Sequence, residues 1–135
     1  MQVIGFNLLK ILVEREEKTD EQLNIKQNLN IDEVIKDNVK FSKDDLLKIK
    51  FTFTTDYNDG KFAKIEFKGQ TILLPEKDEL KEILKSWKDK QLPENVRIPL
   101  FNFIMGKCNI KTLNLEDEMG LPLHIPMPKI TSKKE

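Results

Sequence analysis

The residues of this chain that could do chemistry are few, and their spacing does not favour catalysis. His124 is the single histidine and Cys108 the single cysteine. His124 lies in a proline-spaced tail, which is a poor place to hold an imidazole between an oriented nucleophile and an acid. Cys108 falls on an apolar helical stripe and is predicted to be buried and inert, because reactive thiols need exposure and positive neighbours. We therefore predict no catalytic residue and no enzyme activity.

The residue types that bind metals are too few or wrongly spaced to form a site. One cysteine and one histidine cannot build a structural zinc centre. The acidic run Glu116, Asp117 and Glu118 lacks the alternating oxygen ligands of a calcium loop, and it predicts a solvated helix end. The five glycines form neither a dinucleotide-binding nor a P-loop motif. The sequence thus predicts no metal and no cofactor.

The composition is that of one globular domain with balanced charge. The chain has 135 residues, of which 39% are hydrophobic, and we expect a single domain over residues 1–130 with a frayed tail over residues 131–135. Lys+Arg and Asp+Glu are both 23, and only Arg15 and Arg97 are arginines. The zero net charge and the scarcity of arginine both argue against nucleic acid as a partner, unless the protein is part of a ribosome.

The remaining bulk features predict a cytoplasmic protein. A single cysteine cannot form an internal disulfide, which is typical of a reducing compartment. Residues 1–16 are apolar, but Asn7 and Lys10 interrupt them, so they resemble neither a signal peptide nor a membrane span. We expect no membrane partner.

The first half of the chain has the period of β-strands. Residues 23–31 and 47–54 alternate apolar and polar side chains, and residues 61–74 continue the strand pattern after a hairpin signal at residues 57–60. Residues 3–14 are apolar on both alternating faces, which predicts a strand covered on both sides by its own helices and by a partner chain. Short connections favour an antiparallel meander of four strands.

The second half has the period of helices. After Pro75, one amphipathic face is formed by residues at i, i+3, i+4 and i+7: Leu80, Ile83, Leu84 and Trp87. A longer helix is expected from about Glu94 to Glu118, with more apolar surface than one sheet face can cover. These patterns predict an α+β fold, with a four-stranded antiparallel sheet and two C-terminal helices packed on one of its faces. The same excess of apolar surface predicts self-association.

The closing segment from Gly120 to Ile130 alternates apolar residues with prolines. Proline holds such a segment extended without internal hydrogen bonds. Two interpretations are open. The segment packs back on its own core, or it is an arm that covers or lines an apolar groove.

The order of four strands, a first amphipathic helix, a long second helix and a Leu-Pro closing segment resembles the SecB-type export chaperones, including archaeal SecB-like proteins. The resemblance covers residues 3–130 in layout and size. Its most specific part runs from Arg97 to Ile130, where Leu100-Phe101-Asn102 is similar to the family's "LFP"-like stretch and residues 121–128 are similar to its closing "PxLxLxPVNF"-like segment.

The resemblance implies an α+β protomer that assembles as a dimer or tetramer and binds unfolded polypeptide in long apolar grooves. By position, the groove would be lined by the second strand, the connection after it and the second helix: Ile25, Leu29, Ile31, Val34, Ile35, Phe41, Phe103, Ile110 and Leu113. The family docks on the translocation motor through an acidic sheet face. Here the outward face of the strands carries lysines instead, which argues against docking on the motor but leaves the implied fold and peptide binding: Lys26, Lys48, Lys50, Lys64 and Lys68.

Two functions follow as hypotheses. The first is chaperone-like, non-catalytic binding of unfolded or extended apolar polypeptide. The alternative is a structural subunit of a larger assembly, such as a ribosome-associated protein, which uses the same apolar faces as a permanent interface. A free oligomer favours the first hypothesis, and co-sedimentation with a particle favours the second.

Overall fold

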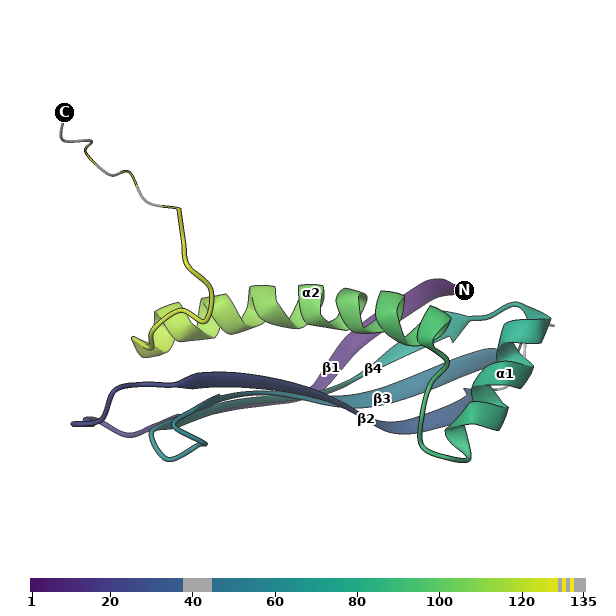
Figure 1. Cartoon of the computed structure of the whole chain (residues 1–135), viewed down its shortest axis with the longest axis horizontal. Coiled ribbons are helices and arrows are strands. Elements are labelled where there is room, and N and C mark those ends of the chain that lie inside the picture. The colour runs from purple at the N-terminus through teal and green to yellow at the C-terminus, as the bar shows by residue number, and fades with distance from the viewer. Residues whose placement is uncertain (38–44, 129, 131, 133–135) are drawn as a thin grey trace.

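The computed structural model describes residues 1–37, 45–128, 130 and 132. Four antiparallel strands precede two helices along the chain: β1 (Gln2–Arg15), β2 (Ile25–Asp37), β3 (Leu46–Tyr57), β4 (Ala63–Leu74), α1 (Lys77–Trp87) and α2 (Glu94–Met119). Helix α2 lies across one face of the sheet, and α1 lies at one end of it (Figure 1). The predicted α+β class, with its four-stranded antiparallel sheet and two C-terminal helices, is confirmed.

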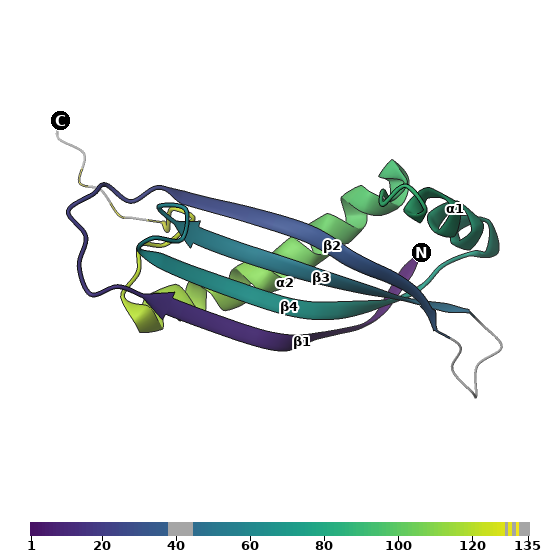
Figure 2. The ribbon, with the colours of Figure 1, turned by 90° about the horizontal axis from the view of Figure 1, so that it is seen from below.

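The strand order in the sheet is β1-β4-β3-β2. Strands β2, β3 and β4 follow one another as a meander, as expected. The meander does not include β1, which pairs with β4 at the opposite edge from β2. Residues 16–24 connect the two edges around the strand ends (Figure 2). Short connections favour neighbouring strands, but this one is long enough to pass β3 and β4.

The alternation predicted for the central strands is confirmed. Along β3, Leu47, Ile49, Phe51 and Phe53 are at most 1% exposed, and the lysines and threonines between them lie on the opposite face. The hairpin after β3 turns through residues 58–60, which all have positive φ angles between 55° and 87°. Asparagine, aspartate and glycine tolerate this region, which explains the turn.

Strand β1 shows why its sequence is apolar on both alternating faces. Its register against β4 shifts twice, and at these β-bulges Ile4 and Leu9 have no partner residue. Each bulge reverses the alternation, so that Phe6, Leu8 and Val13 all pack against the core under α2. Ile4 and Leu9 themselves are 48% and 59% exposed. The helices of this chain therefore cover one face of β1 rather than both.

Helix α2 is positioned by a row of buried residues with a strict period of four: Val96, Leu100, Ile104, Cys108, Thr112 and Glu116. At about 100° per residue, a step of four turns the row by about 40° each time. Over five such steps the buried side shifts by about 200° around the helix axis. Helix α2 crosses the sheet obliquely, from the β1 side at its C-terminus to the β2 side at its N-terminus (Figure 2).

Two expectations lie wholly or mostly outside the described residues, namely the groove residue Phe41 and the frayed segment 131–135. The extent of the single domain over residues 1–130 remains a prediction. Neither helix in the described part of the chain is long and apolar enough to cross a membrane.

Candidate functional site

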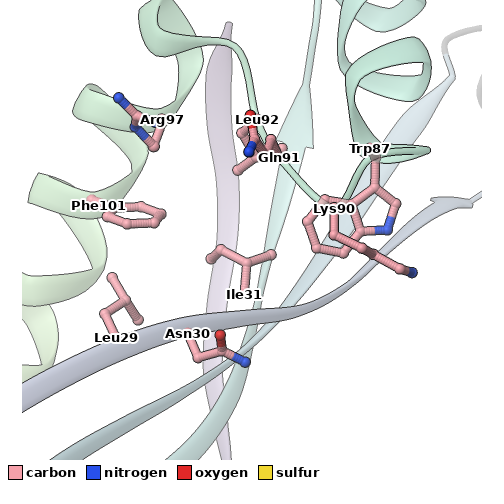
Figure 3. A pocket seen from close by; sticks show the side chains of 9 residues that line it. All are labelled: Leu29, Asn30, Ile31, Trp87, Lys90, Gln91, Leu92, Arg97 and Phe101. Carbon is pink, nitrogen blue, oxygen red and sulfur yellow. The ribbon is translucent and has the colours of Figure 1, made fainter.

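The oblique path of α2 leaves a groove between α2 and the edge strand β2. The groove consists of two adjoining pockets of about 270 and 210 Å³ that share Leu29 and Phe101. The larger pocket lies beneath the connection between the helices (Figure 3) and is lined by Leu29, Asn30, Ile31, Trp87, Lys90, Gln91, Leu92, Arg97 and Phe101. The smaller one is lined by Gln27, Asn28, Leu29, Phe53, Phe101 and Met105. We call these two pockets together the β2–α2 groove.

The wall of the groove on α2 follows from helical geometry. The row Phe101, Met105, Asn109 and Leu113 is again spaced by four, about 90° around the helix from the buried row and toward β2. Phe101 and Met105 are half-buried and contact the core. The Nε2 atom of Gln27 donates to Oδ1 of Asn109 at 3.0 Å and bridges β2 to α2. This bridge marks the end of the groove toward the C-terminus of α2.

The groove has an apolar centre and a cationic end. Leu29, Phe101 and Met105 form its middle, whereas Lys90 and Arg97 lie at the end near α1. The Nζ atom of Lys90 lies 5.0 Å from the centre of the Trp87 ring, a cation–π distance. No lining residue is an aspartate or a glutamate. The arrangement can bury apolar side chains, and it can attract a carboxylate at one end.

The structure places the predicted groove residues of β2 in different surroundings. Leu29 and Ile31 line the groove. Ile25 and Val34 are half-buried against the core beyond its two ends. Val34 and Ile35 belong to β2 itself, although the sequence suggested a connection there. Ile35 is opposite Lys48 on the other face of the sheet and is 38% exposed, so it does not line the groove.

The predicted residues of α2 also separate around the helix axis. Phe103 does not line the groove, because it lies on the opposite flank of α2 from Phe101 and packs edge-on against Phe6 of β1, with ring centres 5.8 Å apart. Ile110 points away from the sheet and is 65% exposed. Leu113 shares the row of Phe101 but lies beyond the bridge at the end of the groove.

Sequence reasoning missed Phe101 and Met105 as groove residues. The signal that could have identified them is the period of four in α2, because residues one position after the buried row form its flank toward β2.

A second cluster ties the end of α2 to the segment that follows it. The Glu116 carboxylate is fully buried, and it accepts hydrogen bonds from the Tyr57 hydroxyl and from the His124 backbone N–H, the latter at 3.2 Å. The Nδ1 atom of His124 lies 2.6 Å from the same carboxylate. Because a carboxylate oxygen only accepts, Nδ1 carries the proton in this contact. We call these three residues the Glu116 clasp.

The clasp corrects two expectations from the sequence. Glu116 is not part of a solvated helix end, although its neighbours Asp117 and Glu118 are exposed. The tail does hold its imidazole beside an oriented acid. Burial and the adjacent Glu116 carboxylate raise the pKa of Tyr57, so its hydroxyl remains a donor.

The clasp is closed to a substrate. The His124 side chain is 2% exposed, and its Nε2 atom is buried without a hydrogen-bond partner in the described structure. Cys108 is buried as well, and burial raises the pKa of its thiol to about 12. Within the described part of the chain, no three histidine, cysteine or acidic side chains lie close enough to hold a metal ion. The open feature of this face is thus the β2–α2 groove.

No protein-family model matches this chain, and no curated protein matches its sequence. Its fold is similar to that of a SecB-like chaperone of Mycobacterium tuberculosis, solved in complex with a ChAD peptide from the HigA1 antitoxin. The two structures superpose with a TM-score of 0.53 at 14% sequence identity, over 97% of this chain and 87% of the other. The chain therefore has a SecB-like fold.

Proposed function

We propose that this protein binds extended apolar segments of unfolded polypeptide in the β2–α2 groove, without catalysis. The observation that carries the proposal is the continuous apolar centre of the groove, where Leu29 and Phe101 join two open pockets. The SecB-like fold supports it, because a neighbour with this fold was solved with a peptide bound.

The groove suits an extended chain for two physical reasons. Met105 and Phe101 offer apolar surface, and a flexible methionine side chain adapts to clients of different shape. Strand β2 is at the edge of the described sheet, so its outward backbone groups can pair with an extended segment. Affinity should be about micromolar or somewhat tighter, because the client loses conformational entropy on binding. Salt should weaken binding little, because apolar burial drives it.

The test is a pair of substitutions on α2. Met105→Asp places a charge in the groove and should weaken binding of reduced, carboxymethylated α-lactalbumin, a permanently unfolded probe, by about tenfold or more. Asn102→Asp places the same charge on an exposed part of the same helix, outside the groove and the exposed apolar surface, and should leave binding unchanged. Binding is measured by fluorescence anisotropy of the labelled probe, and circular dichroism checks that both variants fold. Failure of the unmodified protein to bind the probe would refute the function.

We also propose self-association through the apolar surface outside the groove. Large apolar side chains from 48% to 65% exposed lie on β1 and on the outer side of α2: Ile4, Leu9, Ile11, Ile98 and Ile110. Apolar surface of this kind usually marks an interface. Light scattering should give the mass of a dimer or tetramer, and a stable monomer at micromolar concentration would contradict this. Sedimentation with a larger particle would instead favour the assembly-subunit hypothesis.

A further inference from the structure

The segment after the Glu116 clasp divides into an anchored part and an exposed arm. Leu121 is 5% exposed and belongs to the core, and the backbone oxygen of Pro122 lies 3.1 Å from the Tyr57 hydroxyl. Further along, the yellow end of the described chain leaves the body of the molecule (Figure 1). The side chains of Ile125 and Met127 there are 42% and 49% exposed.

The arm has the chemistry of the client that we propose for the groove. Its apolar residues alternate with Pro126 and Pro128, which keep it extended and remove backbone donors. Two exposed apolar side chains on an extended proline-spaced segment would gain from burial in an apolar groove. Because the prolines already restrict the arm, closing it costs less entropy than ordering a flexible chain.

The anchor holds the arm at the start of the groove. Tyr57, which is one of the three clasp residues, is paired with Ile25, the first residue of β2. From position 25 to Leu29 in the groove, β2 rises by about 13 Å at about 3.3 Å per residue. Residues 125–128 span about the same length when extended. An arm that turns along β2 therefore reaches the centre of the groove of its own chain.

We propose that the arm is an autoinhibitory strap, in which Ile125 and Met127 close over the β2–α2 groove of the same chain and compete with clients. The inference rests on the proposed function and names its regulation. The structure represents the open state, in which the groove is free. The Glu116 clasp is the fixed point about which the arm moves, and clients bind only the fraction of molecules with an open arm.

The first measurement detects closure without any client. Ser132→Cys places a nitroxide label beyond the arm, and the buried Cys108 thiol remains unlabelled because its pKa is raised to about 12. The label broadens the NMR signals of nearby amides. If the arm closes, the amide signals of Leu29 and Met105 should broaden, whereas that of Lys64 on the opposite sheet face should not. Absence of broadening would overturn the strap. Broadening seen only when labelled and isotope-enriched chains are mixed would show that the arm acts between copies, which also overturns it.

The second measurement tests competition. Ile125→Ser together with Met127→Ser should tighten binding of the carboxymethylated α-lactalbumin probe by about three- to tenfold, because a larger fraction of grooves is open. The matched control, Ile125→Val with Met127→Leu, keeps the arm apolar and should leave the affinity unchanged. Probe binding that does not respond to the serine variant would overturn the strap and leave the proposed function intact. Broadening in the groove without any probe binding would show that the arm closes, but it would remove the proposed function and overturn the strap as a competitor of clients.

Discussion

Replacing Glu116 by leucine should destabilise the folded protein by about 3 kcal/mol. The carboxylate accepts a hydrogen bond from the His124 backbone N–H and contacts its Nδ1 atom; both contacts are at least partly buried, and the His124 side chain is 2% exposed. Leucine accepts neither, and a buried donor without an acceptor costs about 1–3 kcal/mol. The loss at the Tyr57 hydroxyl costs less free energy, because this hydroxyl can still donate to the Pro122 oxygen at 3.1 Å. Removing a buried charge offsets part of the loss.

Glu116→Gln provides the finer comparison. The amide oxygen of glutamine can accept from His124, while its NH₂ group donates to the Tyr57 oxygen, whose own proton then turns to Pro122. The donors that Glu116 satisfies keep a partner, but the second N–H of the buried amide has none, and the strength that ionic charge gives a hydrogen bond is lost. We expect a loss of about 1–2 kcal/mol, smaller than that of Glu116→Leu. The order of the two variants thus tests the hydrogen bonds rather than the presence of a polar group.

The assay is urea unfolding followed by circular dichroism, at one fixed protein concentration because self-association would shift the midpoint. Glu118→Leu is the matched control, since Glu118 is exposed two residues further along the same helix and should change stability by less than about 0.5 kcal/mol. The Glu116→Leu loss corresponds to a fall in Tm of about 12 °C at about 4 °C per kcal/mol. A loss below about 1 kcal/mol for Glu116→Leu would refute the reasoning.

Three further outcomes are expected. Cys108 should react slowly with a thiol reagent at pH 8 and rapidly in denaturant, because burial raises its pKa to about 12, and fast labelling of the native protein would contradict this. Gly69→Ala should lower the free energy of unfolding in urea by about 2 kcal/mol or more. The reason is that the new Cβ would lie 2.7 Å from the Phe51 ring and 2.8 Å from a backbone oxygen of β1. An unchanged midpoint would argue against this close approach. The ammonium of Lys10 lowers the pKa of Glu66, so this carboxylate stabilises the fold above its ordinary titration range and less so as the pH falls through its lowered pKa. Glu66→Gln should therefore lower stability slightly at pH 7 and not at pH 3, and an equal loss at both pH values would show that the ion pair is not the cause.

The parts of the fold that could be predicted are those in which one local pattern decides the structure. Strand β3 alternates because a single face is buried, and its turn residues tolerate positive φ, so both were evident from the sequence. Strand β1 follows the same rule, but the bulges at Ile4 and Leu9 reverse its phase twice. A register shift depends on the partner strand, which no local pattern identifies.

The groove was harder to predict than the strands, because it depends on how α2 lies on the sheet. Of the expected residues, Leu29 and Ile31 lie in it, whereas Phe103 and Ile110 lie outside it. No local pattern shows which side of α2 faces β2, and the binding role of these residues stays a prediction. Glu116 shows the same limitation. Its position in the row of four pointed to burial, but a charged residue is rarely buried without a partner, and Tyr57 is distant in sequence.

One geometric cause connects the core, the clasp and the groove. A buried row with a period of four turns slowly around α2, and the helix crosses the sheet obliquely. Near the C-terminus of α2 the last member of that row is Glu116, and the segment after the helix covers the start of β2, where Leu121 completes the core. Further along β2, Leu29 is only half-buried and the groove remains open. The spacing of four in α2 thus carries the buried row onto the Glu116 carboxylate, and the oblique path of the helix leaves the groove beside Leu29.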